Sequence, residues 1–216
     1  MLFNCVPLKI DSLPSVVTLL PLRGLILVPR SELRLPISDF SSLAMVTSAI
    51  RCGSYVGVVQ LRDKDGENED VFRCGCVGRV SDCHESNDGQ LAFVVQGICR
   101  FEIIKELPRE QNARQAEVSY DKYQLDVVRE VDYSFDRERL LDVLKRCCSK
   151  FPVIPQIDEL AAMSNEKLIS MLMMVWPFDP YEKQALLETE HVLAQSNLIT
   201  SLLELDAGMK DSILYH

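Results

Sequence analysis

The residues that could do chemistry in this chain are few, and they do not form a complete catalytic set. Ser164 and Lys167 have the S-x-x-K spacing that carries a serine nucleophile and its lysine in some hydrolases. No S-D-N or K-T-G element follows in the sequence. Ser164 also stands directly before an apolar helical pattern, where its hydroxyl would cap the first turn. We therefore interpret Ser164 as a helix cap and Lys167 as a solvated side chain.

Other catalytic patterns are absent from the sequence. It contains no G-x-x-x-x-G-K-[ST] phosphate loop and no G-x-S-x-G nucleophile turn. The histidines His84, His191 and His216 are scattered, and no base with an orienting acid can be assigned among them. We expect no catalytic residue and no cofactor, so the chain is predicted not to be an enzyme.

A metal hypothesis rests on Cys74, Cys76, Cys83 and His84. Zinc sites normally use C-x₂₋₄-C pairs at turns, whereas this pair is C-x-C inside a strand pattern. Residues two apart on a strand face the same side, so both thiols are expected in the core and no metal is predicted. The adjacent pair Cys147–Cys148 cannot face one direction on a helix, so at least one of the two is expected to be packed. With no secretion signal recognised, the eight cysteines are interpreted as reduced thiols.

The segments that would position these residues change character near the middle of the chain. The first half predicts strands with one helix, and "ELRLPI" alternates so that Leu33 and Leu35 share a side. Asp88-Gly89 is typical of a hairpin turn, and Gly97 predicts a bend or bulge in the strand that follows. The aliphatic residues 25–28 of "LLPLRGLILVPR" are expected in the core of a small curved sheet. A helix is predicted over Asp39 to Arg51, closed by Gly53.

The second half shows helical periodicity from Phe135 onward. Helices are predicted around residues 140–144, over "IDELAAM", over 164–175 and over about 189–205. Between them, Asp179, Pro180 and Glu182 form a capping-box pattern that predicts a helix start. These periods predict an α+β chain with a β domain over residues 1–123, a charged linker, and an all-α helical bundle over residues 134–216.

The bulk properties favour a soluble cytoplasmic protein. No apolar run approaches the length of a membrane span, and no export signal is recognisable, so no membrane association is expected. The net charge of −9 makes nucleic acid an unfavourable partner.

The succession of segments resembles a known family. "LLPLRGLILVPRSELRLPI", "LAMV", "YVGVVQ", "CGCVGRV" and "VVQGICRFEIIKEL" are similar in order and spacing to the amino-terminal domain of ATP-dependent Lon proteases. "WPFDPYEKQALLE", followed by a leucine-rich helix, resembles the later part of stand-alone bacterial proteins that carry this domain. The family commonly has a segment of the type "IFEPRY" before the embedded helix, whereas this chain has "ISDFSS", so contacts of that segment do not carry over.

The resemblance implies a PUA-like β-barrel with one embedded helix, a following helical bundle, and a role in binding protein substrates without the ATPase and peptidase modules. We therefore expect a protein-binding module whose partners are unfolded or exposed apolar polypeptide segments. An adaptor or regulator that docks onto a separate ATP-dependent protease is the alternative. A small-molecule or nucleic-acid binder is a third hypothesis, because the PUA-like architecture hosts RNA binding elsewhere. The acidic charge argues against RNA, and fold alone does not determine function. The predicted peptide-binding patch is exposed and apolar, and consists of Phe40, Met173, Met174, Trp176 and Phe178. For the methionines, core filling is the preferred alternative.

Overall fold

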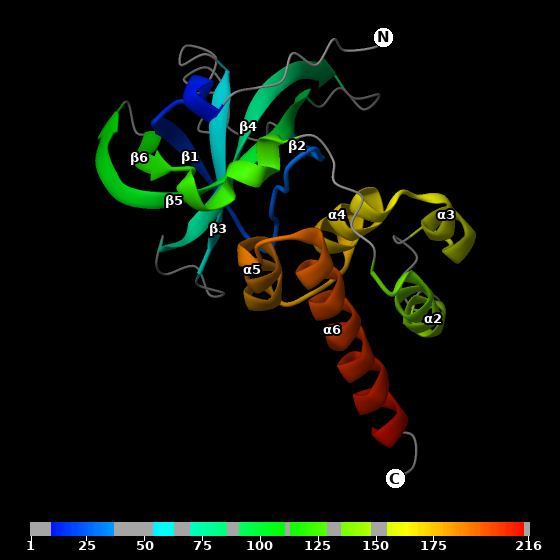
Figure 1. Cartoon of the computed structure of the whole chain (residues 1–216). Coiled ribbons are helices and arrows are strands. Elements are labelled where there is room, and N and C mark those ends of the chain that lie inside the picture. Colours follow the sequence, from blue (N-terminus) through cyan, green and yellow to red (C-terminus); the bar gives the residue numbers. More distant parts are fainter. Residues whose placement is uncertain are drawn as a thin grey trace. The chain divides into compact units, whose positions relative to one another are not determined.

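The chain divides into two compact units. In the computed structural model they are Met1–Glu130, here called the strand unit, and Val131–His216, here called the helical unit. The structure describes residues 10–36, 54–62, 70–85, 91–110, 113–128, 135–147 and 155–213. Figure 1 shows a sheet in the first unit and helices in the second, which agrees with the predicted α+β class.

The strand unit contains strands of very different length, and two short 3-10 helices flank them. The elements are η1 (Ile10–Ser12), β1 (Val16–Leu22), β2 (Glu32–Pro36), β3 (Tyr55–Leu61), β4 (Val71–Glu85), β5 (Leu91–Glu110), β6 (Ala113–Ser119) and η2 (Asp121–Val127).

The sheet closes on itself. Its strand order is β2-β5-β4-β3-β1-β6, and β6 pairs with β5 as well as with β1. The ring β1-β3-β4-β5-β6 therefore returns to β1, while β2 pairs with the first part of β5. Only β1 and β3 run parallel among these pairings. This closure is the curved barrel that the family resemblance implied.

The hairpin of β4 and β5 carries the bulge predicted at Gly97. The register shifts between Val77, which faces Cys99, and Gly78, which faces Gly97. The Gly97 position also lacks room for a side chain, because a Cβ there would lie 2.2 Å from the carbonyl oxygen of Val28. The connecting turn with Asp88-Gly89 lies outside the described residues.

The aliphatic run that follows β1 packs inward without being a strand. Ile26, Leu27 and Val28 are buried. The segment is held by Arg30 N–H, which donates to Gly97 O at 2.9 Å, and by Gly97 N–H, which donates to Ser31 O at 2.8 Å. Leu25 is 39% exposed, so its predicted core position is wrong. It follows Gly24, whose φ of 62° turns the chain at the edge of the barrel.

The barrel core is packed around Phe101. Its ring is fully buried, and a Cβ on Gly75 would lie 2.7 Å from the ring atom Cζ. The predicted inward direction of Cys74 and Cys76 is confirmed, since both are buried. On β2, Leu33 and Leu35 are buried and the residues on either side of each are exposed, as the alternation predicted.

The helical unit begins after the described part of the strand unit ends. Its helices are α2 (Arg137–Cys147), α3 (Ile157–Ala162), α4 (Asn165–Val175), α5 (Pro180–Glu188) and α6 (Val192–Ile213). Helix α6 contacts α2, α4 and α5, and so connects these helices within the unit. Fully buried Leu140, Leu168, Leu186 and Leu203 come from four of these helices. Each helix start predicted here lies within a few residues of the observed one.

Some predicted features fall on residues that are not described. These are the helix over Asp39 to Arg51, the side chains of Cys83 and His84, and Cys148. Cys147, the other half of the vicinal pair, is buried as one member was predicted to be.

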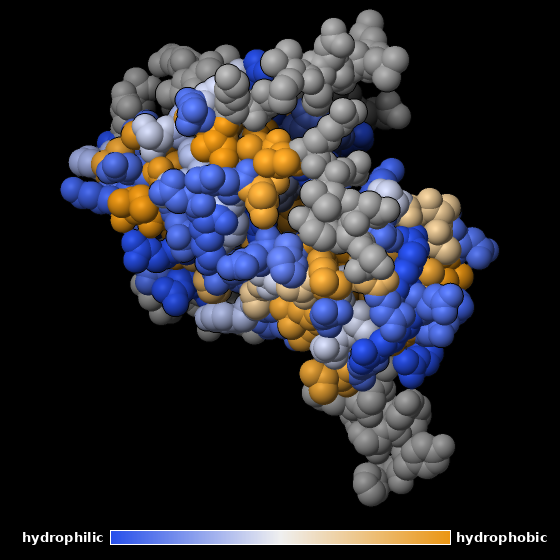
Figure 2. All heavy atoms as spheres, viewed as in Figure 1, coloured by the Kyte–Doolittle hydropathy of each residue, from blue (hydrophilic) through white to orange (hydrophobic). Residues whose placement is uncertain are grey.

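The surface is mixed in polarity. Figure 2 shows hydrophobic residues in separate groups between hydrophilic ones on the face it draws. In the described part of the chain, no helix combines the length and apolar character needed to cross a bilayer.

Candidate functional site

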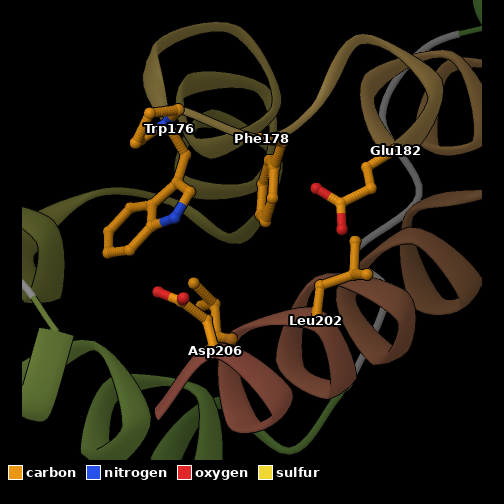
Figure 3. Close-up of a pocket in the computed structure, with 7 residues that line it drawn as sticks. Trp176, Phe178, Glu182, Leu202 and Asp206 are labelled. Carbon is orange, nitrogen blue, oxygen red and sulfur yellow. The ribbon is translucent and has the colours of Figure 1, made fainter. Parts of the chain in front are cut away.

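A pocket of about 240 Å³ opens within the helical unit. All of its lining residues belong to the turn between α4 and α5, to α5 or to α6. They are Trp176, Pro177, Phe178, Glu182, Leu202, Leu203 and Asp206. In Figure 3 the rings of Trp176 and Phe178 face Leu202 and Asp206 across the pocket, and the Glu182 carboxylate points toward it. We call this site the Trp176 pocket.

The aromatic wall is fixed by the way α4 ends. Pro177 disfavours a helical conformation in the residue before it, so Trp176 becomes the cap of α4, with extended backbone angles. Its N–H donates to Leu172 O at 3.0 Å, and Phe178 N–H donates back to Trp176 O at 2.8 Å. The two rings lie 6.2 Å apart between centroids and are tilted by 39°. This short turn therefore presents two aromatic rings side by side.

The acidic wall is partly fixed by the capping box at the start of α5. Asp179 N–H donates to Glu182 Oε2 at 2.8 Å, and Tyr181 N–H donates to Asp179 Oδ1 at 3.0 Å. The capping box predicted from the sequence is confirmed, and it also orients the Glu182 carboxylate. Asp206 adds a second carboxylate from α6. Both charged residues that line the pocket, Glu182 and Asp206, are acidic.

The predicted peptide-binding residues differ in how far they are buried. Met173 and Trp176 are 1% and 3% exposed, so they do not form the exposed patch that was expected. Met174 and Phe178 are half-buried, and Phe40 lies outside the described residues. The pocket brings Trp176 and Phe178 together. Whether this group binds peptide stays a prediction.

Sequence reasoning missed the other side of the pocket. Leu202 and Asp206 are four residues apart and so share a helix face, but nothing in the sequence places that face against Trp176. Glu182 was recognised only as a capping residue. The helical spacing shows that Leu202 and Asp206 share a face, but it does not show which element packs against that face.

The S-x-x-K motif is a helix start, as predicted. Ser164 Oγ accepts from the backbone N–H of Lys167 at 3.4 Å, and Lys167 is exposed. The exposed His191 has a similar local role, because its Nδ1 accepts from Ala194 N–H at 3.1 Å at the start of α6.

A buried polar cluster lies in the strand unit. Arg100 of β5 donates from Nε and Nη2 to the carboxylate of Asp126 in η2, at 2.9 and 2.8 Å. The Arg100 guanidinium also stacks on Tyr123, with Cζ 4.5 Å from the ring centroid. Tyr123 Oη in turn donates to Cys74 Sγ at 3.2 Å. The cluster fastens η2 to the barrel.

The electrostatics of this cluster are those of a closed core. Burial alone would lower the pKa of Arg100, but the hydrogen bonds and charge of Asp126 raise it. Burial, with the negative charge of Asp126, raises the pKa of the Cys99 thiol to about 12. Burial also raises the pKa of Tyr123. These thiols and phenols stay protonated near neutral pH, so they are not reactive nucleophiles.

The described part of the chain shows no cluster of side chains that could hold a metal ion. No three metal-binding side chains come together among the residues whose side chains are placed. Cys74 and Cys76 are explained as buried core thiols.

Comparisons with known proteins agree on one family. Residues 16–204 match the family described as the ATP-dependent protease La (LON) substrate-binding domain. Lon protease 2 of Myxococcus xanthus is 27% identical over 207 residues, which cover 89% of this chain and 24% of that protein. The Lon protease of Anaeromyxobacter dehalogenans is 28% identical over 207 residues, with 89% and 23% covered. The chain thus spans about a quarter of the length of these curated relatives.

Solved structures show the same fold. A Lon N-terminal domain protein from Xanthomonas campestris superposes with a TM-score of 0.60 at 20% identity, covering 87% of this chain and 98% of that one. The N-terminal domain of Mycobacterium avium complex Lon protease gives a TM-score of 0.61 at 18% identity, covering 88% and 98%. The fold class predicted from the sequence is confirmed by both.

Proposed function

Because the chain belongs to the family of Lon substrate-binding domains, we propose that it binds exposed apolar segments of unfolded polypeptides and performs no catalysis itself. The family match is the observation that carries this proposal, since it extends across both units. The matched segment is a substrate-binding domain, and no catalytic domain is matched.

The described residues give no support to a hydrolytic role. Ser164 and Lys167 are explained by helix capping, and burial raises the pKa of the Cys99 thiol, which disfavours the reactive thiolate. A binding role needs only a concave apolar surface with a few oriented polar groups. The Trp176 pocket has this composition, with two aromatic rings, two leucines and two carboxylates.

The pocket offers a direct optical test of where polypeptide binds. Trp176 is the only tryptophan of the chain, so its emission reports on this site alone. Titration with a short apolar peptide is expected to shift the emission saturably. A matched pair of variants locates the effect, because Phe178→Ala alters the pocket while Tyr181→Ala removes an exposed ring that does not line it.

The binding of the two variants shows whether the peptide occupies the Trp176 pocket. Weaker binding by Phe178→Ala and unchanged binding by Tyr181→Ala support the Trp176 pocket as the site. Binding without any emission change, equally strong in both variants, would place the site elsewhere in the chain.

A further inference from the structure

The Trp176 pocket combines features that suit one class of side chain. Its rings and Leu202 form an apolar wall, and the carboxylates of Glu182 and Asp206 border the same space. An apolar ligand uses only the apolar wall, whereas a ligand that also carries a positive charge compensates the carboxylates as they lose contact with solvent. An acidic ligand would be repelled.

Helix capping does not exhaust the acceptor capacity of Glu182. The Asp179 N–H binds Oε2, whereas a carboxylate offers about four acceptor positions over its two oxygens. The capping bond therefore holds the group in place while Oε1 remains able to accept from a ligand. Asp206 supplies a second acceptor from a different helix, so the two charges reach a ligand from two directions.

A long cationic side chain meets each of these requirements. The methylene stem of lysine or arginine packs along apolar surface while its charged head reaches polar groups. The head gains attraction from aromatic ring faces and from carboxylates. The pocket volume of about 240 Å³ accommodates a single long side chain and excludes a folded element.

We infer that the Trp176 pocket binds one lysine or arginine side chain of a client polypeptide, which makes basic residues within apolar segments the preferred recognition element. This inference rests on the proposed function and adds the chemistry of the side chain that is selected. The net charge of −9 on the whole chain favours the same clients through long-range attraction.

The test compares two fluorescein-labelled peptides on the full chain by fluorescence anisotropy. They share an apolar host sequence and differ only at one central position, which is lysine in one and norleucine in the other. Norleucine keeps the aliphatic stem and removes the charge. The lysine peptide is expected to bind about tenfold more tightly, with a preference that shrinks as salt screens the charges.

Variants assign the preference to the pocket. Asp206→Asn and Glu182→Gln remove one charge each, and the glutamine retains an acceptor for the capping bond. Both are expected to weaken lysine-peptide binding several-fold and to leave norleucine-peptide binding as strong or slightly stronger, because a neutral amide is easier to desolvate than a carboxylate. Asp158→Asn is the matched control, because Asp158 is exposed on α3 and does not line the pocket.

Failure of this inference is distinguishable from failure of the proposed function. Equal binding of the two peptides, or an equal effect of Asp158→Asn and Asp206→Asn, would overturn the lysine pocket and leave polypeptide binding intact. If neither peptide binds while an unfolded protein does, the pocket inference is again wrong. If neither peptide nor unfolded protein binds, the proposed function itself is wrong.

Discussion

Arg100 and Asp126 form a two-point ion pair inside the strand unit, with 5% and 8% of their side chains exposed. The Asp126 carboxylate also accepts from the backbone N–H of Arg100 at 2.9 Å. The pair thus joins β5 to η2, the last described element of the strand unit. Arg30 strengthens the same connection, because its guanidinium donates to the carbonyl oxygens of Asp126 and Val128.

Replacing Asp126 by alanine is expected to destabilise the strand unit by about 3–5 kcal/mol, because a buried guanidinium loses its counter-charge. Urea denaturation followed by far-ultraviolet circular dichroism measures the change. Trp176 emission follows the helical unit separately in the same samples.

Glu106→Ala is the matched control for that measurement. It removes an ion pair with Arg114 in which the glutamate side chain is 42% exposed. Its expected cost is at most about 1 kcal/mol. Equal costs for Asp126→Ala and Glu106→Ala would contradict a structural role for the buried pair.

Gly97→Ala is expected to cost more than Gly24→Ala. A methyl group at position 97 would collide with the carbonyl oxygen of Val28, which belongs to the backbone and cannot move aside easily. Overpacking of this kind costs about 1–3 kcal/mol or more. At Gly24 a Cβ would meet nothing, and only the positive φ of 62° is unfavourable, by about 1–2 kcal/mol. Thermal melting of both variants compares their stabilities, and Gly97→Ala is expected to melt at the lower temperature. A lower melting temperature for Gly24→Ala would contradict the close approach of position 97 to the Val28 carbonyl oxygen.

The strand unit is expected to lose stability as pH rises from about 9 to about 12. The thiol of Cys99 has its ordinary pKa of 9.0 when the chain is unfolded, but burial raises this pKa to about 12 in the folded state. The contribution of this thiol to the free energy of unfolding is therefore complete below pH 9 and is lost as the pH approaches 12. Cys76, Tyr120 and Tyr123 also have raised pKa values and act in the same direction.

Urea denaturation at neutral pH and at a pH of about 10 measures this dependence. Cys99→Ala should show a shallower loss of stability than the parent chain, because one of the ionising groups is missing. An identical slope in the variant would show that Cys99 does not contribute.

Ser164→Ala is expected to destabilise the helical unit by about 1 kcal/mol through loss of the α4 cap. Denaturation followed by Trp176 emission detects it, since Trp176 caps the other end of α4. Ser201→Ala removes an exposed hydroxyl within α6 and should change stability by less than about 0.5 kcal/mol. Loss of a hydrolytic activity in Ser164→Ala, with stability unchanged, would instead favour the nucleophile interpretation.

Local features were predictable from the sequence because they depend on neighbours along the chain. The alternation of Leu33 and Leu35, the bulge at Gly97 and the capping box of Asp179 and Glu182 are of this kind. Leu25 was placed wrongly, because an aliphatic run was assumed to be buried throughout. The turn at Gly24 instead leaves Leu25 partly exposed.

Long-range relationships were not predictable. Arg100 and Asp126 are 26 residues apart, and no periodic pattern indicates that η2 returns to β5. Leu202 and Asp206 meet Trp176 and Phe178 only because α6 packs beside α4 and α5. The resemblance named the family, whereas the packing of these helices defined the candidate site.

The measurement that tests the central claim most directly is fluorescence anisotropy of a labelled, permanently unfolded protein titrated with the full chain. The proposal predicts saturable binding, no binding of the natively folded parent from which the unfolded client was made, weaker binding by Phe178→Ala, and an intact client on a gel afterwards. Anisotropy that does not change with the unfolded client, or a client that is cleaved by the purified chain, would contradict a non-catalytic polypeptide-binding module.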